Sequence, residues 1–324
     1  MSAPNSSAGN TFEDLSGVAT AAFSNPYDAL ISASEDDPIQ MQARYTTHRN
    51  TRNSQQKAKM LDKEFSGPDI DPILLRLSDV TVEPGYVDPR HCLVFWGRPS
   101  DKVKNLISRV QQELLAVAPN LWVMPQDCLH ITALEVTHSK KAEEIQQIVD
   151  SVGDKIPAIT NFTFHHRARL IKPMIGFDAS ALALSFVPAA GEPSALGRTK
   201  QDDKYTYHHL RRDLYTLCQE IGVAVDSRYV VPSSHLTIGR FIKSSDFNDG
   251  KGTYDPQKMQ AFIEKVEEIN AWLEQEFWPE HNGGKVLPGA DWIVGEEQGL
   301  NCRESLIKTH GYGGGDSLHQ GKGF

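Results

Sequence analysis

One short motif occurs twice in this chain and constrains its fold more than any other feature of the sequence. Residues 128–136 read Cys-Leu-His-Ile-Thr-Ala-Leu-Glu-Val, and residues 233–242 read Ser-Ser-His-Leu-Thr-Ile-Gly-Arg-Phe-Ile. Each stretch is apolar enough to form a strand, in which successive side chains point to opposite faces. His130 and Thr132 therefore share one face of the first strand, as do His235 and Thr237 on the second. Each strand presents an imidazole and a hydroxyl on one side and apolar side chains on the other.

The surroundings of the two motifs are also similar, which indicates an internal duplication. The two histidines are 105 residues apart, and each motif comes shortly after an amphipathic helix. Val-Met-Pro at 123–125 leads into the first motif, and Val-Val-Pro at 230–232 leads into the second. We therefore predict an α+β fold of two similar lobes, each of which places one histidine strand at a shared cleft.

The remaining elements follow from hydrophobic spacing. Apolar residues at helical spacing predict helices over 103–117, 142–152, 210–221 and 259–273, and a short helix near 26–33. Apolar runs predict strands over 91–96, 121–124, 160–170, 174–177 and 181–187, and a closing hairpin formed by 292–294 and 305–308. The polar segment 188–204 is predicted as a loop. We assign residues 1–62 to a disordered N-terminal arm, 63–310 to the bilobal domain and 311–324 to a flexible Gly-rich C-terminal tail.

Charge and cysteine content exclude several classes of protein. The formal net charge of −9 argues against a partner such as duplex DNA, but it allows a small basic pocket for one or two phosphates. The four cysteines match no metal-ligand spacing, so we expect reduced thiols in or near the core: Cys92, Cys128, Cys218 and Cys302. No apolar run is long enough for a membrane span, and no secretory signal is apparent. We expect a cytoplasmic or nuclear monomer with no membrane partner.

The paired motifs suit acid–base chemistry on a phosphodiester. Such a reaction needs one group to take a proton from the nucleophile and another to protonate the leaving oxygen. Histidine suits both roles because its ordinary pKa lies near neutrality. Thr132 and Thr237, each on the face of its histidine, would donate hydrogen bonds to the phosphoryl oxygens. This scheme needs no metal and no cofactor.

The pair His130-Ile-Thr132 and His235-Leu-Thr237 resembles the double His-x-Ser/Thr signature of the two-histidine (2H) phosphoesterase superfamily. The segment from Pro232 to Arg240 is an especially close match to the second signature, and the resemblance extends over about residues 70–310. The chain looks most similar to the fungal-type RNA ligase/cyclic nucleotide phosphodiesterase family. The resemblance implies a bilobal fold with two pseudo-symmetric lobes, each with an antiparallel sheet backed by helices, and a central cleft that holds both motifs. It also implies His130 and His235 as the acid–base pair and Thr132 and Thr237 as phosphate ligands. We take His235 as the base and His130 as the acid.

Several further side chains are candidates for substrate binding. Arg240 would add positive charge beside the phosphate, although strict alternation places it on the Leu236 face unless Gly239 breaks the pleat. Phe241 and Tyr312 are candidates to contact the nucleotide, and Trp96 and Trp292 are candidates to stack on its base. The adjacent pairs His165-His166 and His208-His209 are predicted to be surface residues.

These features favour a metal-independent phosphodiesterase that hydrolyses a 2′,3′-cyclic phosphate, on a cyclic nucleotide or at an RNA terminus. One alternative is an RNA-end ligase, which runs the same chemistry backwards with a 5′-hydroxyl in place of water. Another is a non-catalytic sensor that binds nucleotides or RNA in the same cleft. Substitution of both histidines separates these classes, because an enzyme would lose turnover while it retains binding.

Overall fold

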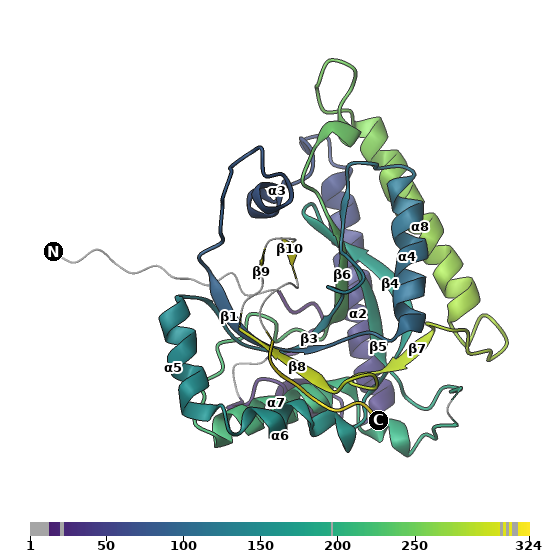
Figure 1. Ribbon diagram of the computed structural model, residues 1–324. Coiled ribbons are helices and arrows are strands. Elements are labelled where there is room, and N and C mark those ends of the chain that lie inside the picture. Colours follow the sequence, from purple (N-terminus) through teal and green to yellow (C-terminus); the bar gives the residue numbers. More distant parts are fainter. Residues whose placement is uncertain (1–12, 20–22, 196, 305–306, 309–310, 313–316) are drawn as a thin grey trace.

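The two motifs lie on neighbouring strands in the middle of one large antiparallel sheet (Figure 1). The computed structural model describes residues 13–19, 23–195, 197–304, 307–308, 311–312 and 317–324; for 307–308 and 311–312 it describes the backbone alone. Along the sheet the strands run in the order β11-β8-β1-β3-β6-β5-β4-β7, and β2 pairs with β6. β3 and β6 carry the motifs. The order divides into two sets of four strands, β11-β8-β1-β3 and β6-β5-β4-β7, and the pairing of β3 with β6 joins them into one sheet.

The strands of this sheet are β1 (His91–Gly97), β2 (Trp122–Val123), β3 (Ile131–Lys140), β4 (Arg169–Phe177), β5 (Ala181–Pro188), β6 (Ser234–Arg240), β7 (Asp291–Ile293), β8 (Leu300–Arg303) and β11 (Ser317–Gln320). A separate pair consists of β9 (Ile307–Lys308) and β10 (Gly311–Tyr312). The α+β prediction is therefore confirmed, with the two predicted sheets joined edge to edge. The predicted hairpin is wrong, because β7 pairs with β4.

The helices in the described part of the chain are α1 (Asp28–Ala33), α2 (Pro38–Met60), α3 (Pro72–Ser78), α4 (Asp101–Leu115), α5 (Ala142–Val152), α6 (Ile156–Thr160), α7 (Tyr207–Glu220) and α8 (Pro256–Phe277). α4 and α8 lie side by side, and α8 packs against β4 (Figure 1). α7 packs against β3, and α2 packs against β4 and β5. The four longer predicted helices and the short one near residue 30 are confirmed. The predicted strand over 160–170 is wrong, since the 3₁₀ helix Phe162–Phe164 precedes β4 there.

The local sequence explains where several helices begin. α2, α3 and α8 each start with an Asp-Pro pair, in which the Asp side chain accepts a hydrogen bond from the backbone N–H two residues later. Proline at the first helical position loses no hydrogen bond and has its φ already set. α4 shows the apolar spacing of an amphipathic helix, and its buried side chains belong to the main core: Val103, Leu106, Ile107, Val110 and Leu114.

The N-terminal region differs from the prediction of a disordered arm over 1–62. α2 packs on the sheet, and three of its side chains donate hydrogen bonds to carbonyl oxygens of β4 and β5. Gln42 bonds to Pro188 at 2.8 Å, Arg49 to Lys172 at 2.7 Å and Asn53 to Ile175 at 2.9 Å. α2 is held to the sheet by these polar contacts. Its sequence therefore needs no continuous apolar stripe, which is the pattern by which an amphipathic helix is predicted.

The C-terminal segment also differs from a flexible tail over 311–324. β11 pairs with β8, and the backbone N–H of Phe324 donates to the carbonyl of Glu296 at 3.0 Å. All four cysteines are buried, as expected. Among the helices in the described part of the chain, none is long and apolar enough to cross a membrane.

His208 of α7 is buried against the N-terminal segment, so the prediction of a surface residue is wrong for it and for its neighbour His209. The Nε2 of His208 lies 2.9 Å from the carbonyl oxygen of Tyr27, and its Nδ1 lies 3.0 Å from the hydroxyl of Tyr45. A carbonyl only accepts, so Nε2 donates and Nδ1 accepts from the tyrosine. Burial lowers the pKa of His208 to about 3.

We expect His208 to make the stability of the protein depend on acid pH. Its pKa is lower in the folded protein than the ordinary 6.5, so the unfolded chain takes up a proton first. This contribution to stability is complete above pH 6.5 and is lost as the pH falls toward 3. Between pH 4 and 6 the free energy of unfolding, measured with urea, should rise less steeply with pH in His208→Gln than in the wild type, by about 1.4 kcal/mol per pH unit. Parallel pH profiles for the two proteins would contradict this.

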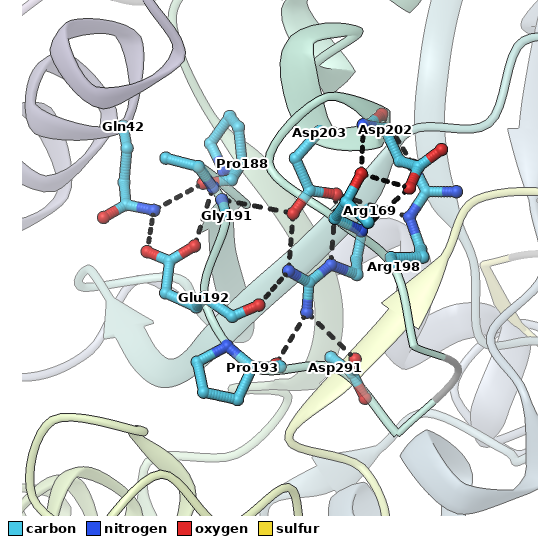
Figure 2. Close-up of polar contacts among 12 residues, drawn as sticks. Gln42, Arg169, Pro188, Gly191, Glu192, Pro193, Arg198, Asp202, Asp203 and Asp291 are labelled. Carbon is cyan, nitrogen blue, oxygen red and sulfur yellow. Dashed lines mark hydrogen bonds and ion pairs between the residues drawn. The ribbon is translucent and has the colours of Figure 1, made fainter.

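The segment between β5 and α7, predicted as a loop, is anchored by a buried ion network (Figure 2). Arg169 of β4 forms a two-point contact with Asp203, with Nη2 at 2.5 Å and Nε at 3.2 Å from the carboxylate oxygens. It also donates to Asp291 and to the carbonyls of Glu192 and Pro193. These contacts use all five N–H donors of the guanidinium group. Arg169 and Asp203 are each 1% exposed, so the pair is out of water.

Asp203→Asn is expected to lower the free energy of unfolding by about 3 kcal/mol, because it leaves a buried cation with a weakened partner. Asp202→Asn is the matched control. That neighbouring carboxylate is exposed, and its substitution should cost less than about 0.5 kcal/mol. Urea unfolding of the three proteins measures both values. Equal stabilities of the two variants would show that the network does not stabilise the fold.

Candidate active site between the two histidine strands

The pairing of β3 with β6 brings the two motifs to one place. Ile131 lies opposite Leu236 in this antiparallel pair, and both side chains are buried in the core. Residues next to them along each strand therefore point to the other face of the sheet. That face carries the polar side chains of both motifs, which line one cavity of about 220 Å³: His130, Thr132, His235 and Thr237.

The register also pairs each imidazole with the hydroxyl of the other motif. Continued by one residue on either side of the Ile131–Leu236 pair, it places His130 opposite Thr237 and Thr132 opposite His235. Cross-strand neighbours of this kind have Cβ atoms about 4.5–5.5 Å apart. The four groups thus form a compact arrangement with approximate twofold symmetry. An anion between the two rings would meet a hydroxyl from each strand.

His130 is fixed from behind by two contacts. Its Nδ1 lies 2.7 Å from the carbonyl oxygen of Cys128, which can only accept, so Nδ1 carries the proton. Its ring stacks on Trp96 with a centroid distance of 3.8 Å and an interplanar angle of 20°. The orientation of the ring is therefore set, and Nε2 is the nitrogen left to exchange a proton in the cleft.

His235 is held in a corresponding way. Its Nδ1 lies 2.9 Å from the hydroxyl oxygen of Ser233, two residues earlier in the chain, as Cys128 is for His130. A hydroxyl can donate or accept, so this contact is compatible with either state of the ring. The ring of Tyr229 lies beside it, with centroids 6.2 Å apart. Here too Nε2 is the nitrogen left for a substrate.

The surroundings of both rings favour the neutral imidazole. Burial is the largest cause, and it lowers the pKa of His130 to about 3 and that of His235 to about 4. The Cys128 carbonyl opposes this at His130, whereas the positive charge of Arg52 adds to it at His235. A bound anion raises the pKa of an adjacent imidazole. A phosphate in the cleft would therefore promote uptake of the proton that an acid catalyst needs.

A β-bulge in β6 turns Arg240 toward the cleft. Thr237 and Gly239 face two consecutive residues of β5, so Ile238 is an extra residue in the ladder. Such an insertion reverses the alternation of faces beyond it. Arg240 thus lines the motif cavity, where it lies 3.3 Å from the carboxylate of Asp71. Its role in substrate binding stays a prediction.

The same bulge sends Phe241 into the core, contrary to the prediction of a nucleotide contact. Phe241 is 1% exposed and packs edge-to-face against Phe247 and Phe262. The base-stacking predictions for tryptophan also fail, because Trp96 is covered by His130 and Trp292 is buried beside Phe186. Tyr312 belongs to β10, but its side chain lies outside the described residues, so its role is untested.

Sequence reasoning missed a buried arginine that supports both motifs. Arg211 of α7 is 2% exposed. It donates to the carbonyl of Ala133 in β3 at 3.3 Å and to that of Val231, just before β6, at 2.8 Å. It also bonds to the carbonyl of Tyr229 and, at 3.0 Å, to the hydroxyl of Tyr27. The available signal was a charged residue at helical spacing within the apolar stripe of α7.

Among the described residues, no group of three or more His, Cys, Asp or Glu side chains is placed to hold a metal ion. The imidazoles that face the cleft can accept or donate a proton, and the hydroxyls can donate hydrogen bonds. The lining of the cleft holds Arg90, Arg211, Arg228 and Arg240 against two carboxylates, Asp88 and Glu135, so positive charge is in excess. The arrangement can therefore hold an anion between two proton-exchanging rings.

No family model and no curated protein sequence matches the chain. Solved structures similar to it include TT0787 of Thermus thermophilus, at 14% identity and a TM-score of 0.39, which covers 71% of this chain and 96% of that one. Usb1 of Kluyveromyces marxianus has 12% identity and a TM-score of 0.35, with 67% and 95% covered. The conserved protein of unknown function ATU0111 of Agrobacterium tumefaciens has 11% identity and a TM-score of 0.41, with 76% and 99% covered. Likenesses of this size assign neither a family nor an activity.

Proposed function

We propose that this protein is a phosphodiesterase that hydrolyses a 2′,3′-cyclic phosphate, on a nucleotide or at an RNA end, by paired-histidine catalysis. The observation that carries the proposal is the β3–β6 register, which faces two oriented imidazoles and two hydroxyls into one cavity. The double His-x-Thr pattern that resembles the 2H phosphoesterases points the same way. The reaction as written uses no metal.

In the proposed step, a water oxygen forms a bond to phosphorus while one histidine takes its proton. The bond from phosphorus to the 2′ or 3′ oxygen breaks, and the other histidine protonates that oxygen. Thr132 and Thr237 donate hydrogen bonds to the non-bridging oxygens, where charge accumulates. Arg240 adds positive charge on the same wall of the cavity.

We assign His235 as the base and His130 as the acid. The carbonyl of Cys128 accepts from Nδ1 of His130 in both its neutral and its protonated state, so this ring can hold a second proton on Nε2 without a change of partner. The hydroxyl of Ser233 can accept from or donate to His235. It therefore does not favour the protonated ring in the same way.

The proposal is tested by incubation of purified protein with the four nucleoside 2′,3′-cyclic phosphates in excess EDTA, followed by phosphorus NMR. Turnover to a monoester in EDTA is the expected result, and the product isomer identifies the leaving oxygen. If a 5′-hydroxyl RNA end is joined instead, the protein is a ligase. If nucleotides bind tightly but none is converted, the cleft is a sensor. Either result would replace the proposed hydrolysis.

A further inference from the structure

α2 forms one wall of a second cavity, which adjoins the motif cavity at His235. This second cavity has a volume of about 150 Å³. Both cavities are lined by His235, Thr237 and Arg240, so a ligand held between the two histidines lies next to the second space. From α2 the cavity is lined by His48, Arg49, Arg52 and Asn53. None of these side chains belongs to the two motifs.

Arg49 is a buried cation with unused donors. It is 6% exposed, its Nη1 donates to the Lys172 carbonyl, and its guanidinium lies 4.9 Å from the ring centroid of Trp278. Within the described part of the chain its Nε and Nη2 have no hydrogen-bond partner, and both atoms are covered by protein, so an anion in the cavity would act on Arg49 through its charge. A buried charge is costly unless it is paired and hydrogen-bonded. An anionic ligand in the adjacent cavity would reduce this cost.

The carboxylates near Arg49 are engaged elsewhere. Glu274 and Glu280 are the acidic groups whose charge acts on Arg49. Glu280 lies 2.8 Å from the amino group of Lys172, and Glu274 lies 3.2 Å from the ring of His281. The positive charge of Arg49 is therefore only partly balanced by these carboxylates.

The other groups that line the cavity also favour an anion. Arg52 is bound to Asp178 at 2.5 Å and Arg240 lies 3.3 Å from Asp71, so two guanidinium groups there are already paired and Arg49 is the third. Counting Glu13 at the exposed rim, the lining holds three guanidinium groups against two carboxylates. Phosphate esters suit such a mixed, arginine-bearing site because guanidinium donors match their oxygens.

We propose that the α2-lined cavity binds a second phosphoryl group of the substrate, one nucleotide away from the phosphate that reacts between the histidines. This inference rests on the proposed function. The group would be either a terminal 5′-phosphate or the internucleotide phosphate of an RNA end, which share the same recognition chemistry. α2 thus selects substrates that carry a further phosphate over a bare cyclic nucleoside phosphate.

The kinetic test compares uridine 2′,3′-cyclic phosphate with its 5′-phosphorylated form and with a dinucleotide that ends in the same cyclic phosphate. We expect the wild type to prefer a substrate with the second phosphate by about tenfold or more in kcat/KM. Arg49→Gln should lose this preference while its activity on the bare substrate stays within about twofold. Lys59→Gln, an exposed charge on the same helix, should keep the preference. A loss in Arg49→Gln that is equal for all three substrates would overturn the proposal.

A binding measurement keeps this inference separate from the proposed hydrolysis. Calorimetry with uridine 3′,5′-bisphosphate and uridine 3′-monophosphate isolates the contribution of the 5′-phosphate without any turnover. The bisphosphate should bind more tightly to the wild type, and Arg49→Gln should remove the difference while Arg49→Lys keeps part of it. Thermal unfolding confirms that each variant is folded. Equal affinities for the two ligands in the wild type would overturn the subsite even if cyclic phosphates are hydrolysed.

Discussion

Replacement of either cleft histidine by alanine is expected to lower kcat/KM by about 10²- to 10⁴-fold, the usual contribution of one acid–base group. His130→Ala removes the proposed proton donor, and His235→Ala removes the group proposed to accept the proton from water. Steady-state kinetics on a nucleoside 2′,3′-cyclic phosphate measures the loss of kcat/KM.

The double variant distinguishes a joint mechanism from two separate effects. Groups that act in one step are strongly non-additive, so the double variant should lose little more activity than the worse single variant. His165→Ala is the control, because that histidine is exposed and belongs to neither motif. Full activity in either cleft variant would remove that histidine from the mechanism.

Replacement of Arg211 by methionine should impair both stability and activity. It removes the donor for the carbonyls of Ala133 and Val231, which lie in or next to the two motif strands. The Val231 carbonyl still accepts from the N–H of Ser233, so the loss is not complete at both strands. A buried acceptor left without a partner costs about 1–3 kcal/mol, so the free energy of unfolding should fall by roughly 2 kcal/mol. Because small displacements of reacting groups are costly, kcat should fall by about tenfold to a hundredfold.

Two further variants separate positioning from simple loss of stability. Arg212→Met is the matched control, since the side chain of Arg212 is partly exposed and pairs with Asp213. Arg211→Lys keeps a charge but not the forked donors, so it should recover part of the stability and less of the activity. Wild-type kcat in a folded Arg211→Met protein would show that the arginine does not position the histidines.

The site could be predicted from the sequence where the signal is local. Alternation of faces along each strand placed His130 with Thr132 and His235 with Thr237, and all four line one cavity. Whether the two strands meet depends on strand pairing, which no local pattern encodes. The shared lead-in and the duplication supported that prediction.

Failures arose where tertiary contacts override local patterns. The extra residue Ile238 in β6 reverses the faces beyond it, which exchanges the expected positions of Arg240 and Phe241. α2 is stabilised by polar contacts with sheet carbonyls, so hydrophobic spacing does not reveal it. The Asp37-Pro38 pair was its one local signal. β7 pairs with β4, which lies more than 100 residues earlier, whereas a hairpin prediction considers only strands that follow one another in the sequence.

The roles of the two histidines are tested most directly by a cyclic phosphate in which sulfur replaces the leaving oxygen. A thiol has a pKa near 8.5, so a thiolate leaves without help from an acid, whereas an alkoxide does not. Activity on the sulfur substrate is measured for the wild type, His130→Ala and His235→Ala. We expect His130→Ala to recover to within about tenfold of the wild type and His235→Ala not to recover. Equal recovery of both variants, or recovery of His235→Ala alone, would contradict this expectation.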